Sequence, residues 1–267
     1  MIFEFPLHLP RNAFSARDAA RAGDIWRAFQ DVALLGSTAC GWPPSRYRED
    51  GIAFVVRTMT ARHFREARYG EQITARTCIS EFRRGLLITR QIELIGESGP
   101  IAQATQEWAH VRLVADGMRP ARASETLQAA FQIDERLSAT SFPEFEEADH
   151  ARTHSFRFPC WHTWMDPLAH VNHPAYVDWC DEAISVAMAK AGLDPLDLQP
   201  VAEWVKWRSG VEAPADVEVR TRVMGITAAG EVVCEHHIET GAAPSAVALT
   251  VRRLQKGRPE TLRNALR

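Results

Sequence analysis

The feature of this sequence that most constrains its fold is an internal repeat of one order of secondary structure. The first half reads as a strand over residues 1–9, a helix that is capped by Asp24 and ends near 36–41, and four β-branched, apolar strands. Those strands are predicted at residues 51–65, 72–82, 86–96 and 100–113. The second half repeats this order, with a strand at 152–163, a helix at 174–191, and strands at 201–211, 216–226, 231–240 and 245–255. Such a repeat predicts two similar domains in one chain.

Short matches between the halves support a true duplication. Glu66-Ala67 recurs as Glu212-Ala213, and residues 73–77 (ITART) resemble residues 217–221 (VEVRT). Asp18 also lies before the first helix much as Asp166 lies before the second. We therefore predict that the chain arose by duplication of one unit of about 110–120 residues.

One long helix followed by a meander of strands predicts an α+β fold, in which a curled antiparallel sheet wraps around its helix. Two such tandem units are expected to pair sheet edge to sheet edge, as a pseudo-dimer. The predicted N-terminal unit spans residues 1–118 and the C-terminal unit residues 151–267. Residues 119–150 read as a connector, partly helical around 124–131, with an acidic end made by Glu144, Glu146, Glu147 and Asp149.

The composition limits the classes of function. A formal net charge of −3 predicts no general affinity for nucleic acid, and no apolar run is long enough to span a bilayer. Five cysteines without regular spacing argue against a disulfide framework, and Cys160 and Cys180 are predicted to be buried thiols. The N-terminus lacks the charged start and apolar segment of a secretion signal, so a cytoplasmic location is expected.

Residues 161–183 hold the most informative stretch of the chain. Pro174 suits the first position of a helix, where its missing N–H costs nothing, and His173 before it is the predicted N-cap. The helix that follows has an apolar face at helical spacing. That face contains Tyr176, Trp179, Cys180, Ala183, Ile184, Ala187 and Met188. The helix therefore begins in a polar loop and is buried along its length.

The polar loop is similar to a known signature. Residues 166–176, DPLAHVNHPAY, resemble the D-x-(N/x)-x-H-V-N-N-x-x-Y motif of the acyl-acyl-carrier-protein thioesterases, and are equally close to the 4-hydroxybenzoyl-CoA thioesterase pattern. In the first half, residues 69–71, 83–84 and 101–108 resemble the carrier-protein enzymes. The resemblance implies a tandem hotdog fold. The sequence departs from the motif at Leu168, where Asn is usual, and at His173, where the second Asn is usual.

The resemblance implies hydrolysis of an acyl thioester in fatty acid or lipid metabolism. It makes Asp166 the general base, or the nucleophile through a mixed anhydride. His170 and Asn172 are the other expected catalytic side chains, orienting water and holding the loop. The N–H groups at the helix start, above all that of His173, are expected to bind the oxyanion.

The expected substrate is a thioester of acyl carrier protein or coenzyme A. Tyr176 in the second half, and Trp26 and Phe29 in the first helix, are the expected substrate-binding residues. The first loop has no His or Asn after Asp18, so we expect one reactive centre per chain, in the second half. The resemblance implies a reaction without a cofactor. A metal is not expected either, because His170 and His173 do not share a helical face. Assembly of two such chains into a homodimer is an open alternative.

Three other interpretations stay open. Asp166 can simply be a turn residue that accepts backbone N–H groups. The chain can be a hotdog dehydratase of 3-hydroxyacyl thioesters, or, given Leu168, a non-catalytic protein that binds acyl thioesters. A basic C-terminal run is either a surface for acidic partners or a solvated tail. That run contains Arg252, Arg253, Lys256, Arg258, Arg263 and Arg267.

Overall fold

The contacts within the chain divide it into two compact units. The computed structural model describes residues 1–147, 153–241 and 243–266. Unit 1 contains Met1–Phe14 and Asp24–Ser141, and unit 2 contains Ser15–Gly23 and Phe142–Arg267. This division differs from the predicted boundaries at 118 and 150. The loop before the first helix belongs to unit 2, and residues 119–141 belong to unit 1.

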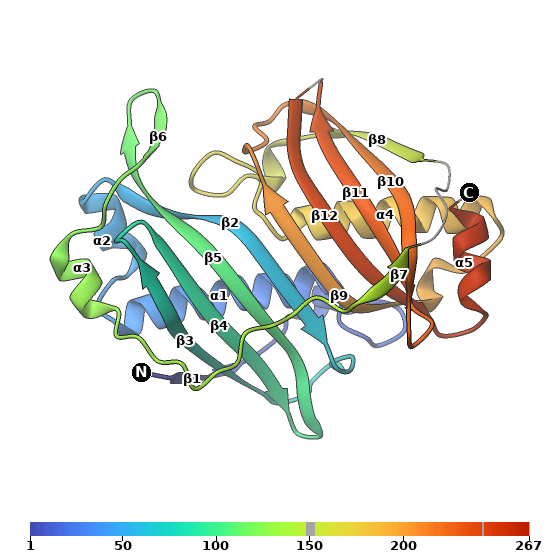
Figure 1. Cartoon of the computed structure of the whole chain (residues 1–267), viewed down its shortest axis with the longest axis horizontal. Helices are drawn as coiled ribbons and strands as arrows, with labels where there is room; N and C mark the ends of the chain where they lie inside the picture. Colours follow the sequence, from blue (N-terminus) through green and yellow to red (C-terminus); the bar gives the residue numbers. More distant parts are fainter. Residues whose placement is uncertain (148–152, 242, 267) are drawn as a thin grey trace. The chain divides into compact units, whose positions relative to one another are not determined.

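Unit 1 is an antiparallel sheet that curves around one long helix, α1 (Ala22–Ala39), seen behind the strands in Figure 1. The strand order is β1-β3-β4-β5-β2, and β6 pairs with β5. The strands are β1 (Phe3–Leu7), β2 (Ile52–His63), β3 (Ile73–Arg83), β4 (Leu87–Gly96), β5 (Gly99–Val114) and β6 (Gly117–Pro120). The smaller helices are η1 (Arg11–Ala13), α2 (Pro44–Glu49) and α3 (Glu125–Ala130).

Unit 2 repeats this arrangement around α4 (Ala175–Lys190). Its strand order is β9-β12-β11-β10, and β10 continues the sheet by pairing with β8 and, further along, with β7. The strands are β7 (Phe145–Glu147), β8 (His154–Cys160), β9 (Leu198–Trp207), β10 (Ala215–Thr227), β11 (Val232–Thr240) and β12 (Ala243–Leu254). The remaining helices are η2 (His162–Trp164), η3 (Pro195–Asp197) and α5 (Pro259–Ala265).

The strand orders confirm the duplication, because β1-β3-β4-β5-β2 matches β8-β10-β11-β12-β9 strand for strand. The matching pentapeptides also take the same place in the two sheets. Residues 73–77 pair with β1, so that Thr77 faces Phe3, and residues 217–221 pair with β8, so that Thr221 faces His154. The short connection between the predicted strands 86–96 and 100–113 is a hairpin in which Gly96 pairs with Gly99.

Both long helices bury the faces that their spacing predicted, and both begin at a residue other than the predicted one. In α1, Trp26, Phe29 and Val32 are all fully buried. Asp24 is not the N-cap of α1; it lies in the first turn and pairs with Arg27 at 3.3 Å. Helix α4 has Pro174 rather than the predicted His173 at its N-cap, and Pro174 has φ and ψ of −63° and −25°.

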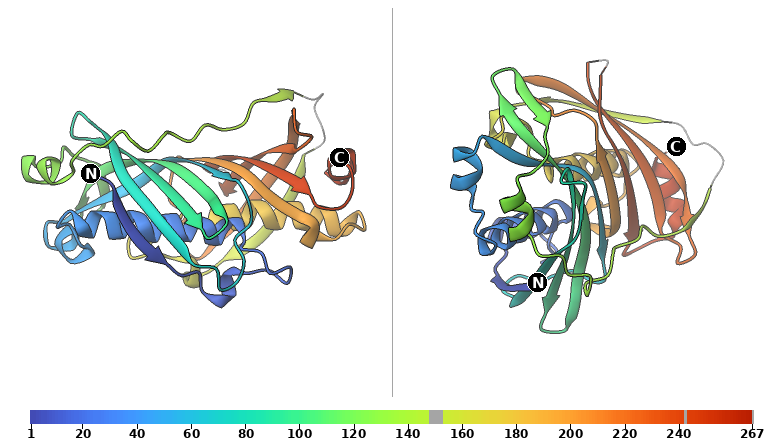
Figure 2. Two further views of the ribbon diagram at one scale, coloured as in Figure 1. Left: turned by 90° about the horizontal axis from the view of Figure 1, so that it is seen from below. Right: turned by 60° about the vertical axis from the view of Figure 1, so that its left-hand side comes forward.

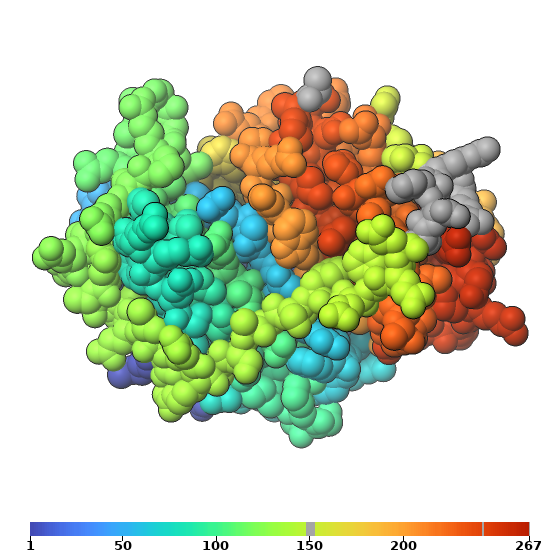
Figure 3. Space-filling view, viewed as in Figure 1, coloured from blue at the N-terminus to red at the C-terminus, as the bar shows by residue number. Residues whose placement is uncertain are grey.

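The segment after β6 packs on unit 1 instead of standing apart as a connector. Ser124 caps α3 by accepting from the N–H of Leu127, and Leu127 and Phe131 join a core cluster with Trp42. The chain then crosses the sheet on the side away from α1 (Figures 2 and 3). There Asp134 donates its N–H to the carbonyl of Ile79 at 2.8 Å. The acidic residue Asp149 and the C-terminal Arg267 lie outside the described residues.

The basic C-terminal run is neither a tail nor a single surface patch. Arg252 in β12 is fully buried, and its guanidinium donates to Asp181 of α4 at 2.7 Å and to Glu203 of β9 at 2.6 Å. Arg253 pairs with Glu231. Cys160 and Cys180 are buried and free, as predicted. Among the described residues, no helix is long and apolar enough to cross a membrane.

Candidate active site

The loop between β8 and α4 is held closed by its own backbone. Met165 and Val171 form an antiparallel bridge across it. Asp166 donates its N–H to the carbonyl of His170 at 2.7 Å, and Ala169 donates back to the carbonyl of Asp166 at 3.0 Å. Asn172 is tied to Trp164 by a third backbone bond of 2.8 Å. These bonds fix Asp166, His170 and Asn172 in one short loop at the start of α4.

The carboxylate of Asp166 takes part in the turn. Its Oδ1 accepts the N–H of Leu168 at 2.8 Å, an Asx-turn bond. The side chain is half-buried, and its second oxygen makes no hydrogen bond with the described residues. The turn interpretation of Asp166 is therefore correct for one oxygen, and it leaves the other available for chemistry.

The loop before α1 has the same backbone geometry. Ser15 donates its N–H to Ala19 at 2.9 Å, and Asp18 donates to the carbonyl of Ser15 at 3.0 Å. The hydroxyl of Ser15 accepts the N–H of Arg17 at 3.3 Å, as Asp166 accepts that of Leu168. Asp18 therefore corresponds to Ala169, with φ of 57° and 62°, and the counterpart of Asp166 is Ser15. The predicted match of Asp18 with Asp166 was wrong.

His170 is oriented by two residues that follow β9. A Cβ atom at Gly210 would overlap the imidazole ring, so the ring occupies space that only glycine leaves open. The Nε2 atom of His170 lies 3.5 Å from Oε1 of Glu212, which is 76 % exposed. The segment after β9 thus sets the position of the ring, and neither residue was predicted for the site. The Glu-Ala match at 212–213 was the only signal in the sequence.

Tyr176 couples the helix to the same segment. It is 1 % exposed, and its hydroxyl hydrogen bonds to the backbone of Val211, whose carbonyl also accepts the N–H of Val171 at 2.8 Å. Burial raises the pKa of the Tyr176 hydroxyl, and the negative charge of Asp166 adds to the rise. Asp166 and Tyr176 therefore share one electrostatic environment.

Aromatic rings surround this environment on the helix side. Tyr176 lies 4.8 Å from Trp179 and 6.0 Å from Trp207, measured between ring centroids. Trp164 packs on Trp179 at 5.1 Å, and the ring of His173 meets Trp207 edge to face at 5.6 Å. His173 is thus a buried residue whose ring contributes to packing. Large apolar rings limit the access of water to a site of this kind.

Asn172 carries a buried polar atom. Its Oδ1 is buried and makes no hydrogen bond with the described residues. An unsatisfied buried acceptor is costly, and such groups call for an explanation. The backbone of Asn172 holds the loop, because it donates its N–H to the carbonyl of Trp164 and accepts the N–H of Ala175 at 3.0 Å. The predicted role of its side-chain amide in holding the loop stays a prediction.

The N–H groups at the start of α4 are mostly engaged. Ala175, Tyr176 and Val177 donate to the carbonyls three residues earlier, at 3.0, 3.3 and 3.1 Å. Pro174 has no N–H to give. The role of the His173 N–H as the oxyanion donor stays a prediction.

Trp26 and Phe29 lie on α1 in unit 1 and are fully buried there. Their predicted contact with substrate stays a prediction. In the described part of the chain, no group of three or more His, Cys, Asp or Glu side chains is arranged to hold a metal ion.

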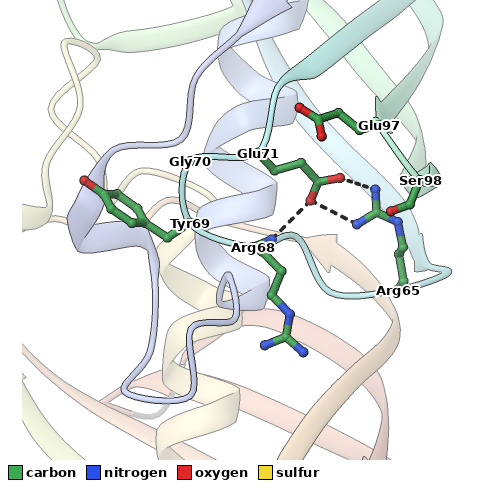
Figure 4. A pocket seen from close by; sticks show the side chains of 7 residues that line it. All are labelled: Arg65, Arg68, Tyr69, Gly70, Glu71, Glu97 and Ser98. Carbon is green, nitrogen blue, oxygen red and sulfur yellow. Dashed lines mark hydrogen bonds and ion pairs between the residues drawn. The ribbon is translucent and has the colours of Figure 1, made fainter.

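Two hollows open on unit 1, and none of the predicted site residues lines either of them. One, of about 500 Å³, contains Arg65, Arg68, Glu71 and Glu97 (Figure 4). There Glu71 pairs with Arg65 and also accepts the N–H of Arg68 at 3.2 Å, and the bond with Arg65 lowers the pKa of the Glu71 carboxyl. The other hollow, of about 560 Å³, lies at the β3–β4 turn.

No protein-family model matches this sequence, and no curated protein matches it. Three solved structures are similar over nearly the whole chain. A Lactobacillus plantarum protein, provisionally assigned as an oleoyl thioesterase, is 17 % identical with a TM-score of 0.78, covering 96 % of this chain and 98 % of its own. An acyl-ACP thioesterase from Bacteroides thetaiotaomicron is 12 % identical, with a TM-score of 0.71 and coverages of 94 % and 98 %. The 12:0-ACP thioesterase from Umbellularia californica is 13 % identical, with a TM-score of 0.74, and the similarity covers 95 % of this chain and 94 % of its own. This similarity confirms the tandem hotdog fold.

Proposed function

We propose that this chain hydrolyses an acyl thioester, carried by acyl carrier protein or coenzyme A, to a free acid and a thiol. The observation that carries the proposal is the comparison of the two loops. The turn needs one acceptor, and a serine hydroxyl supplies it in the first loop. Asp166 adds a negative charge and a second oxygen that the turn does not use. The three thioesterases of the same fold support the reaction class.

In this proposal Asp166 accepts a proton from water as the water oxygen attacks the thioester carbonyl carbon. The C–S bond then breaks, and the proton passes from Asp166 to the leaving thiolate. The N–H of His173 stabilises the oxyanion, an interaction worth ~2.7–4 kcal/mol of barrier for one donor. Direct attack by Asp166, followed by hydrolysis of the mixed anhydride, gives the same products.

His170 orients the water or the carboxylate. Its position follows from Gly210 and Glu212, which hold the ring without taking part in the turn. Leu168, at the usual Asn position, offers only its backbone N–H to Asp166. The proposed chemistry is therefore assigned to Asp166 and the backbone, with His170 in support.

The test is a pair of substitutions at Asp166. Asp166→Asn keeps an acceptor for the N–H of Leu168 but removes the base, and Asp166→Ser reproduces the first loop. Both variants are expected to fold and to release free thiol from acyl-CoA or acyl-ACP at least about 100-fold more slowly, the lower range for general acid–base catalysis. Thiol release is followed with a thiol reagent across acyl lengths, and folding by circular dichroism.

Glu182→Gln, an exposed carboxylate on α4, is the matched control and should keep wild-type turnover. Equal turnover by Asp166→Asn would remove Asp166 from the mechanism. The use of Oδ1 in the turn, together with Leu168, favours a second candidate, an acyl-thioester-binding protein without turnover. Tight binding by the wild type without thiol release at any acyl length would establish that candidate instead.

A further inference from the structure

The hollow at the β3–β4 turn has features that the proposed chemistry does not use. It measures about 560 Å³ and lies wholly within unit 1. We name it the Arg84 hollow and define it by six residues that line it, namely Arg57, Arg83, Arg84, Leu86, Leu87 and His110. Its lining residues include three arginines and no carboxylate. A ligand here meets net positive charge.

Arg84 is the arginine with an uncompensated charge. Arg57 and Arg83 share the carboxylate of Glu107, at 3.6 and 2.8 Å. Arg84 forms no ion pair with the described residues, and it is exposed to solvent. Arg84 has a φ of 54° and is the first residue of the three-residue turn between β3 and β4, in which Leu86 donates its N–H to the carbonyl of Arg83 at 3.0 Å. The hairpin therefore holds this guanidinium at the rim of the hollow.

His110 also lines this hollow, and its ring carries a buried acceptor. It is 2 % exposed, and its Nδ1 lies 2.7 Å from the carbonyl oxygen of Ala121, so Nδ1 carries the proton and donates it. Burial lowers the pKa of the imidazole, which keeps the ring neutral. Nε2 is then a lone-pair acceptor, and it is buried without a hydrogen bond to the described residues. Such an acceptor calls for a donor.

The hollow also has an apolar part. Leu86, which is 38 % exposed, and Leu87 both line it. A ligand that satisfies all three features carries a negative charge for Arg84, a hydroxyl or amide N–H for His110, and an apolar stretch between them. An ordinary fatty acid carboxylate has the charge and the apolar stretch but lacks the donor.

We propose that the Arg84 hollow binds an organic phosphate that also carries hydroxyl or amide N–H groups. Arginine is suited to phosphate, because its planar guanidinium gives paired N–H donors. Coenzyme A and the phosphopantetheine arm of acyl carrier protein share this chemistry, and the choice of these two as sources rests on the proposed function. The hollow of Figure 4 is a poorer candidate, since its Arg65 is already paired with Glu71.

The experiment measures binding without hydrolysis, by titrating the full chain with free coenzyme A in a calorimeter. Arg84→Gln is expected to weaken binding about tenfold or more, because one charge-assisted hydrogen bond is lost. Arg48→Gln, an exposed arginine of α2 in the same unit, is the matched control and should bind like the wild type. On binding, the ¹⁵N resonance of Nε2 in His110 should move, since this nitrogen begins to accept a hydrogen bond.

Titrations with three further ligands show which part of coenzyme A the hollow binds. Binding of 4′-phosphopantetheine comparable to that of coenzyme A would support the arm shared by both carriers, and binding of coenzyme A alone would support its nucleotide phosphates. Equal binding of dodecanoate or inorganic phosphate would overturn the requirement for an organic phosphate with a donor. Equal affinity of Arg84→Gln, or no binding to the wild type, would overturn the site. Asp166→Asn keeps the proposed function and the proposed binding site distinguishable. This variant is expected to lose thioester hydrolysis while it still binds coenzyme A.

Discussion

At the scale of single residues, the candidate site depends both on Asp166 and on the residues that surround it. The same turn exists twice, closed once by Ser15 and once by Asp166. The setting differs as well, because the second loop has His170 where the first has Ala19. The imidazole fits there only because residue 210 has no Cβ. Gly210 is thus a positioning residue of the proposed site.

Substituting Gly210 tests this dependence. Gly210→Ala is expected to displace the His170 ring and to lower kcat for thioester hydrolysis by about 10–100-fold, since small misplacements of catalytic groups cost this much. The melting temperature should change little, because the ring can move toward solvent. Ser209→Ala, one residue earlier, is the control. Wild-type kcat in a variant whose His170 has moved would show that the ring orientation is not needed.

At the scale of elements, one buried ion network ties α4 to the sheet of unit 2. Arg252 of β12 reaches Asp181 of α4 and Glu203 of β9, and both Arg252 and Glu203 are fully buried. A buried pair contributes little net stability over an apolar replacement, but breaking it leaves a charge without compensation. The network therefore fixes how the helix sits on these strands.

Removing Arg252 alone should destabilise the protein more than removing both Arg252 and its partner Glu203. Arg252→Met is expected to lower the free energy of unfolding by about 3–5 kcal/mol, because Glu203 remains buried and charged. Adding Glu203→Leu should recover most of that loss. Arg220→Met, at the exposed pair with Glu239, should cost about 0–1 kcal/mol. Denaturant unfolding measures all three, and equal effects of the single and double variants would contradict the argument.

At the scale of the whole molecule, buried neutral histidines link stability to pH. His236 is fully buried between the hydroxyls of Thr221 and Thr250, each 2.8 Å from a ring nitrogen. Burial, with smaller effects from the charges of Arg252 and His237, lowers the pKa of His236 to about 3. Because the unfolded chain binds this proton at its ordinary pKa of about 6.5, stability is present above that pH and is lost as the pH falls toward 3.

The free energy of unfolding should fall by about 1.4 kcal/mol for each pH unit below 6.5, which makes a loss of about 2 kcal/mol at pH 5. The free energy of unfolding measured between pH 7 and pH 5 should therefore fall more steeply in the wild type than in His236→Gln. His237→Gln, on the opposite face of β11, should keep the wild-type slope. Identical slopes for wild type and His236→Gln would exclude His236 as the source.

The sequence alone determined the repeat, the buried faces of α1 and α4, and the loop that carries Asp166, His170 and Asn172. Hydrophobic periodicity and proline position are local signals, and they depend only on residues near one another in the chain. Helix starts were displaced by one to three residues, because capping depends on the backbone conformation at a single residue.

Only the tertiary structure identified Ser15 as the counterpart of Asp166, and Gly210 and Glu212 as the residues that position His170. It also decided that Arg252 is a buried ion partner and that residues 119–141 belong to unit 1. These relations join residues about 40–70 positions apart, or compare two backbone loops whose sequences differ. Strand pairing brings such residues together, and no local spacing in the sequence records that contact.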